Sequence, residues 1–168
     1  LVQRPEFTAT QYVMLIEAPT HLPLALEGRA PRRITVDTEA SLLVAQQTLA
    51  RVEPTVEGQD ALRGRLRISA IPSSNVLIVS LDGPDPDALG PTLDAVTQAY
   101  LETRRQYLST RRDQVLAVLY SRLADLTEDS GTTDTPEVAE ILRAIDDNLL
   151  TPTEAGEPVR QDPAREIP

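Results

Sequence analysis

The chain has 168 residues, a formal net charge of −10 and 40% hydrophobic residues. This length and composition predict one domain with a modest core, and they argue against collagen-like, disordered and disulfide-scaffold proteins. Because cysteine is absent and His21 is the only histidine, thiolate metal sites and zinc sites with several histidines are also excluded. The acidic charge and the aromatic content of 3% argue against a nucleic-acid partner.

The first third of the chain predicts a strand, a loop and two helices. Residues 7–18 are rich in threonine, valine and isoleucine and begin with near-alternation of polar and apolar residues, which predicts a strand. A loop follows to Pro31. The tripeptide Asp37-Thr38-Glu39 supplies a side-chain acceptor and negative charge before an apolar-periodic segment, which predicts a capped helix ending at Glu53-Pro54. A short helix is expected over residues 59–65.

Two further strands are expected over residues 67–71 and 76–81, joined by a turn that contains Pro72. The continuous apolar run over residues 76–79 is typical of a central strand that is covered on both faces. Asp85 is placed to cap the next helix, with Pro86 at its first position.

The next helix is expected over residues 87–126, which corresponds to a length of roughly 60 Å. Pro91 lies within its first turns and predicts a kink. The middle of the helix, residues 102–114, is mostly polar and is expected to meet solvent or a polar interface.

A second helix opens at Thr135-Pro136-Glu137. Its apolar stripe predicts an antiparallel hairpin with the long helix, and consists of Val138, Ile141, Leu142, Ile145 and Leu149. The predicted fold class is therefore α+β, with a small mixed sheet base packed with helices and a long kinked helix continuing into a helical hairpin. The base is expected over about residues 1–100 and 150–168, and the hairpin over about 100–150.

Four arginines on the long helix are candidates for binding. Arg104, Arg105, Arg111 and Arg112 repeat at a spacing of seven, which predicts a narrow cationic strip. Such a strip suits an anionic glycan, a lipid pyrophosphate or the acids of a neighbouring subunit, because guanidinium groups pair well with phosphate and carboxylate. The alternative is a solvated helix face with local partners in Glu102 and Asp113.

Other charged clusters favour ordinary structural interpretations. Arg29, Arg32 and Arg33 flank a proline in a loop, which indicates an exposed loop or a second contact with glycan or lipid headgroups. Asp82, Asp85 and Asp87 lie close together, but helix capping explains them better than calcium, because the spacing lacks the glycine and the distal glutamate of a calcium loop. His21 has no serine or acid at a recognisable spacing, so no catalytic residue is assigned.

The order of these segments resembles the chain-length determinant family, also called Wzz-type polysaccharide co-polymerases. The resemblance spans about residues 4–126. It rests on the order and spacing of Phe7-Thr8-Ala9-Thr10, Asp37-Thr38-Glu39, Ile68-Ser69-Ala70, Ser73-Ser74-Asn75-Val76-Leu77-Ile78-Val79-Ser80, and Asp85-Pro86-Asp87-Ala88 leading to Tyr100.

The resemblance implies that residues 1–168 form a single extracytoplasmic domain at the plasma membrane, between two transmembrane helices that are not included in the sequence. Pro158, Pro163 and Pro168 would form the approach to the second of these helices. The implied protein is not an enzyme and needs no cofactor or metal. It forms homo-oligomers and regulates the chain length of a bacterial surface polysaccharide, with a polymerase and a lipid-linked glycan as partners.

Two alternatives stay open from the sequence. In the first, the domain is the outer part of an adaptor that activates a cytoplasmic tyrosine kinase in capsule or exopolysaccharide export. In the second, it is a generic interaction module. Because the segment is short compared with lipopolysaccharide-type members, its helical protrusion is expected to be reduced, as in capsule relatives.

Overall fold

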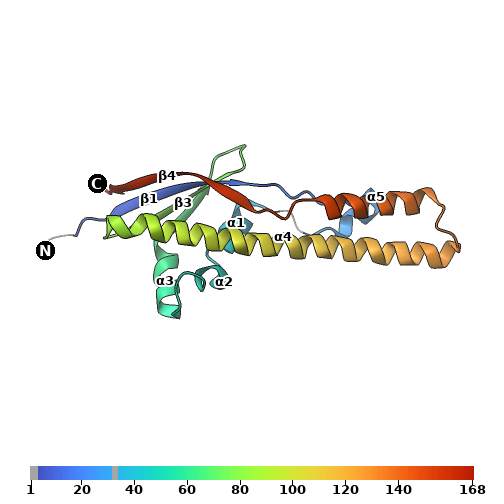
Figure 1. The fold of residues 1–168 in the computed structure, drawn as a ribbon, viewed down its shortest axis with the longest axis horizontal. Coiled ribbons are helices and arrows are strands. Elements are labelled where there is room, and N and C mark those ends of the chain that lie inside the picture. Colours follow the sequence, from blue (N-terminus) through green and yellow to red (C-terminus); the bar gives the residue numbers. More distant parts are fainter. Residues whose placement is uncertain (1–3, 32–33) are drawn as a thin grey trace. The chain divides into compact units, whose positions relative to one another are not determined.

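The computed structural model describes residues 4–31 and 34–168. The described chain forms two compact units (Figure 1). Unit 1 contains residues 4–17, 34–105 and 155–168, and unit 2 contains residues 18–31 and 106–154. The segment after the first strand, residues 18–31, belongs to unit 2 together with residues 106–154. The α+β class is confirmed.

Unit 1 is built on a four-stranded sheet with the order β2-β3-β1-β4. The strands are β1 (Phe7–Leu15), β2 (Leu66–Ala70), β3 (Val76–Gly83) and β4 (Gly156–Glu166). Each of the three strand pairs is antiparallel, whereas the sequence had led us to expect a mixed sheet. β2 and β3 form a hairpin through a turn in which Ser73 has a positive φ of 57°.

β3 is an interior strand, as predicted, but it is covered on only one face. Leu77, Val79 and Leu81 are buried, while Ile78 and Ser80 between them are half-buried. The buried residues join the core cluster of unit 1, which also contains residues of α4. The prediction that both faces of this strand are covered was wrong, because part of the Ile78 side chain is exposed to solvent.

Three short helices precede β2: α1 (Val36–Leu43), α2 (Gln46–Leu49) and α3 (Val56–Arg65). The cap of α1 is Thr35 and not Asp37, because the Thr35 side chain accepts from the Thr38 amide at 3.3 Å. The single helix expected up to Glu53-Pro54 is interrupted between α1 and α2. α3 begins earlier than predicted, because Thr55 caps it through the amide of Gly58.

β4 is a strand that the sequence did not predict, and it contains Pro158 and Pro163. It pairs with β1 along the sheet edge, where Pro158 and Pro163 are tolerated because an edge strand has one side without ladder hydrogen bonds. The register shifts at two points along this pair, between Thr8 and Thr10 and between Tyr12 and Val13. The sequence of β4 lacks the alternation of apolar and polar residues that predicts a strand, so the strand was not predicted.

The long helix α4 (Pro86–Ser130) contains Pro91 and continues from unit 1 into unit 2. Its predicted beginning is confirmed: Pro86 is the first helical residue, and the Asp85 carboxylate accepts from the Asp87 amide at 3.1 Å.

Unit 2 combines the C-terminal part of α4 with α5 (Pro136–Leu150) and the short 3-10 helix η1 (Leu24–Arg29). Thr135 caps α5 as predicted, through the amide of Val138. The helices share a second apolar cluster, which includes Val115, Leu116, Leu119, Ile141, Ala144 and Ile145. Two residues of the predicted apolar stripe are not buried: Leu142 is 46% exposed and Leu149 is 51% exposed. The buried face of α5 runs instead through Ala144 and Asn148.

Candidate functional site

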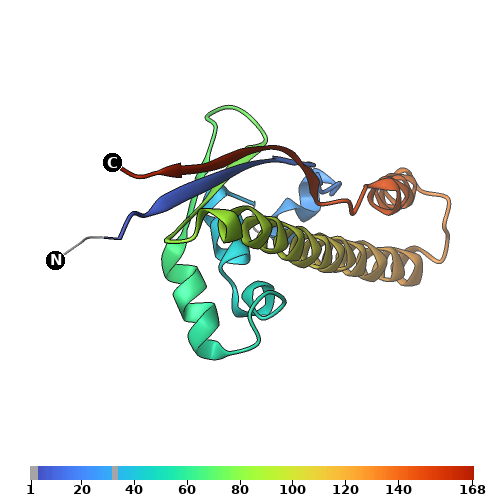
Figure 2. The ribbon, with the colours of Figure 1, turned by 60° about the vertical axis from the view of Figure 1, so that its left-hand side comes forward.

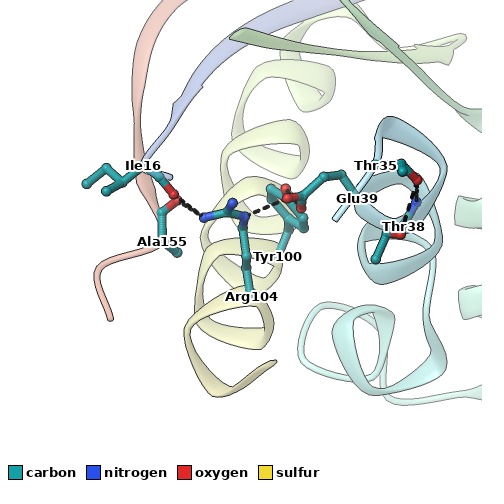
Figure 3. A network of polar contacts seen from close by, with 7 residues as sticks. All are labelled: Ile16, Thr35, Thr38, Glu39, Tyr100, Arg104 and Ala155. Carbon is teal, nitrogen blue, oxygen red and sulfur yellow. Dashed lines mark hydrogen bonds and ion pairs between the residues drawn. The ribbon is translucent and has the colours of Figure 1, made fainter. Parts of the chain in front are cut away.

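A buried polar network in unit 1 is the most organised group of charged side chains in the described chain (Figure 3). It contains Glu39 from α1 with Tyr100 and Arg104 from α4. The Arg104 Nε donates to Glu39 Oε1 at 2.9 Å, and the Tyr100 hydroxyl donates to Glu39 Oε2 at 2.5 Å. The two charged side chains are only 4% and 5% exposed. The carboxylate thus has both oxygens occupied inside the protein.

The Nη1 group of Arg104 binds the backbone. Its Nη1 donates to the carbonyl oxygen of Ile16 at 3.0 Å and to that of Ala155 at 2.5 Å. The Ile16 amide donates to the same Ala155 oxygen at 3.1 Å. The guanidinium therefore links α1, the end of β1 and the residue before β4 through one side chain.

Burial and charge determine the protonation of the Tyr100 hydroxyl. Burial, followed by the negative charge of Glu39, raises the pKa of Tyr100 well above its ordinary value of 10.0. The hydroxyl consequently stays protonated and remains a hydrogen-bond donor over the physiological range. A buried carboxylate with both oxygens occupied by protein donors has a structural role rather than the role of a nucleophile or general base.

Other buried polar pairs extend along the same helix. The Thr97 hydroxyl donates to Gln11 Oε1 at 2.9 Å, and the Thr48 hydroxyl donates to Thr103 at 2.9 Å. Thr103, Arg104 and Leu108 are buried. Part of the polar middle of the helix thus meets a polar interface inside the protein, which is one of the two environments that the sequence predicts.

The structure does not place the four candidate arginines on one solvent-facing strip. Arg104 belongs to the core of unit 1, because it faces a buried carboxylate and two carbonyl groups. Arg105 is 53% exposed and pairs with Glu102 one turn away, as the alternative interpretation predicted. Spacing on a helix gave the angular position of each residue but not the partner packed against it.

Arg111 and Arg112 belong to unit 2. Arg111 is 8% exposed, and the Arg112 Nε lies 3.9 Å from the Asp113 carboxylate. Both line a small cavity together with Thr20, Asn148 and Thr151. The space is about 10 Å³, close to the lower limit for one water molecule, so it is too small for a sugar ring or a phosphate group.

The remaining candidates have structural partners or lie outside the description. Asp82 binds Arg67 and accepts from Thr8, so its carboxylate is engaged in the sheet. Arg29 is exposed at the end of η1, and Arg32 and Arg33 lie outside the described residues.

The backbone of His21 forms hydrogen bonds with the side chain of Asn148. The His21 amide donates to the Asn148 side chain at 3.2 Å, and the Asn148 Nδ2 donates to the carbonyl oxygens of His21 and Ala144. Asn148 thereby joins the loop to α5 within unit 2.

Sequence reasoning missed the network because its members were assigned other roles. Glu39 is interpreted from the sequence as negative charge near a helix N-terminus, and Arg104 as part of a cationic strip. One signal was available: Tyr100 and Arg104 are separated by four residues, so they share a helix face with the buried Val96.

No protein-family model and no curated protein sequence matches the chain. Among solved structures, similar chains include a fragment of WzzB, a polysaccharide co-polymerase from Salmonella Typhimurium. This match has 14% identity and a TM-score of 0.35, and it covers 94% of this chain and 98% of the other. A full-length bacterial polysaccharide co-polymerase matches with 10% identity and a TM-score of 0.36, covering 96% of this chain and 78% of the other. TM-scores this low establish neither a shared fold nor a shared function.

Within residues 4–31 and 34–168, no helix is both long and apolar enough to cross a membrane.

Proposed function

We propose that this chain is a non-catalytic, extracytoplasmic domain of a membrane-anchored polysaccharide co-polymerase, which forms homo-oligomers and regulates the chain length of a bacterial surface polysaccharide. The order and spacing of the sequence segments, from the first strand to the beginning of the long helix, motivate this proposal. The polymerase and its lipid-linked glycan are the partners that it implies.

One observation about unit 1 carries the proposal further. The first and last strands pair side by side, with Phe7 opposite Glu166, and the Ile167 amide donates to the Glu6 carbonyl oxygen at 2.7 Å. The beginning of β1 and the end of β4 therefore lie side by side (Figures 1 and 2). A domain held by two neighbouring transmembrane helices requires this arrangement, because both connections must reach the same membrane surface.

The site chemistry supports a structural rather than a catalytic role. The best-organised charged group, Glu39 with Tyr100 and Arg104, is buried and has its hydrogen bonds satisfied by the protein itself. The cavity beside Arg111 holds no more than a water molecule. A long helix with a hairpin suits a scaffold that organises other components.

The decisive experiment is the size distribution of the surface polysaccharide on a gel, from the source organism with the gene deleted and with it restored. A modal length that shifts on deletion and returns on restoration supports chain-length control. Unchanged length with a reduced amount of polymer favours the kinase adaptor, and unchanged length and amount favour the interaction module. Either of the last two outcomes contradicts the proposal.

A labelling experiment tests the location separately. A cysteine introduced in the full gene product at Ser121, which is exposed on α4, is treated with a membrane-impermeant maleimide. We expect labelling in intact cells above that of the parent protein. Labelling that requires lysis of the plasma membrane would place the domain in the cytoplasm.

A further inference from the structure

The chain passes between the two units at four places, and the polar network lies beside all of them. The crossings follow Glu17, precede Ile34, follow Arg105 and precede Ala155. Within unit 1, the network uses residues next to each crossing, namely Ile16, Thr35, Arg104 and Ala155 (Figure 3).

Three crossings are linked to Glu39 or Arg104 by a hydrogen bond, and the fourth follows Arg105, the neighbour of Arg104 in the sequence. The Glu39 amide donates to the Thr35 carbonyl oxygen at 3.0 Å, and its carboxylate accepts from Arg104. Arg104 then donates to Ile16 and Ala155. One buried ion pair thereby holds the segments that enter and leave unit 1.

Apolar packing is organised differently. Among the described residues, every member of the first apolar cluster belongs to unit 1, and every member of the second belongs to unit 2. Each unit therefore has an apolar core of its own, whereas the network holds the segments of chain that join the two units.

We propose that the network of Glu39, Tyr100 and Arg104 makes the two units unfold as one cooperative structure, because it fixes the four crossing segments inside unit 1. A buried ion pair is a weak stabiliser compared with apolar residues of similar volume, whereas it is specific for one arrangement of its partners. Loss of the network leaves the crossing segments free to fray, and unit 2 then opens without unit 1. This proposal is independent of the proposed function.

The test is native-state hydrogen exchange of the 168-residue chain, followed by mass spectrometry at low urea concentrations. We compare the wild type with Glu39→Leu/Arg104→Met, which removes both charges of the network. The matched control is Glu102→Leu/Arg105→Met, which removes the exposed ion pair one position along the same helix.

In the wild type, we expect the slowest amides of both units to exchange with the same protection and the same urea dependence. In Glu39→Leu/Arg104→Met, protection in unit 2 is expected to fall at least tenfold relative to unit 1. The control should keep this ratio within threefold. A merely structural role would lower protection equally in both units, so an unchanged ratio overturns the proposal, as do separate openings in the wild type.

A milder variant keeps the test informative if the double variant does not fold. Tyr100→Phe removes one donor to Glu39 and leaves the ion pair in place. We expect the ratio to change in the same direction by at least threefold. An unchanged ratio in this variant counts against the proposal.

Discussion

Replacing Arg104 with methionine tests whether the ion pair is as deeply buried as the structure shows. The variant leaves the Glu39 carboxylate in the interior with the Tyr100 hydroxyl as its remaining donor, and it removes the donor to the Ile16 carbonyl. Removing one partner of a buried ion pair is expected to lower the free energy of unfolding by about 3–5 kcal/mol. This is a large part of the roughly 5–15 kcal/mol that stabilises a domain.

The assay is urea unfolding followed by circular dichroism. With a slope of about 2 kcal/mol per molar urea, a loss of about 4 kcal/mol lowers the midpoint by about 2 M. Arg105→Met is the control, because it removes a neighbouring guanidinium that is 53% exposed. Its effect should stay within about 0.5 kcal/mol, as is usual for exposed pairs.

A double-mutant cycle identifies the partner. Glu39→Leu alone leaves a buried guanidinium without its carboxylate, while Glu39→Leu/Arg104→Met leaves neither charge in the interior. The double variant is therefore expected to be more stable than either single variant. If Arg104→Met and Arg105→Met lower stability by similar amounts, or if the cycle shows no coupling, the burial argument is refuted.

Three further predictions follow from particular contacts. Because the pKa of Tyr100 is raised in the folded state, its contribution to stability is fully present below pH 10 and is lost as pH rises further. The loss should be about 1.4 kcal/mol per pH unit, and Tyr100→Phe should remove this component from a series of urea titrations. Gly156→Ala should lower the melting temperature, since Gly156 has a φ of 150° and a Cβ would lie 2.3 Å from a backbone oxygen of β1. Gly64→Ala, at a helical position with open space, should stabilise the chain by up to about 1 kcal/mol. A higher melting temperature for Gly156→Ala than for Gly64→Ala would contradict this reasoning. Leu119→Ala should cost about 2–5 kcal/mol, whereas Leu150→Ala, at a position 81% exposed, should change the free energy of unfolding by less than about 0.5 kcal/mol. Equal effects in urea unfolding would show that Leu119 is not a core residue.

The sequence by itself determined those features that depend on near neighbours. Asp85 with Pro86 begins α4, and Thr135 with Pro136 begins α5, because a helix cap is formed by residues two or three positions away. The strand over β1 and the α+β class follow from periodicity in the same way. The cap expected in Asp37-Thr38-Glu39 was wrong: the observed cap of α1 is Thr35, two residues before Asp37.

The tertiary structure decided which polar residues are buried and which segments pair. Arg104 meets Glu39, Ile16 and Ala155 across separations of 65, 88 and 51 residues, and no local pattern specifies these partners. β4 exists because β1 offers it a ladder of hydrogen bonds, although its own sequence lacks apolar alternation. Local propensity describes how a segment can fold, but the burial of a charge depends on a partner brought from elsewhere in the chain, because only a matched partner offsets the loss of hydration.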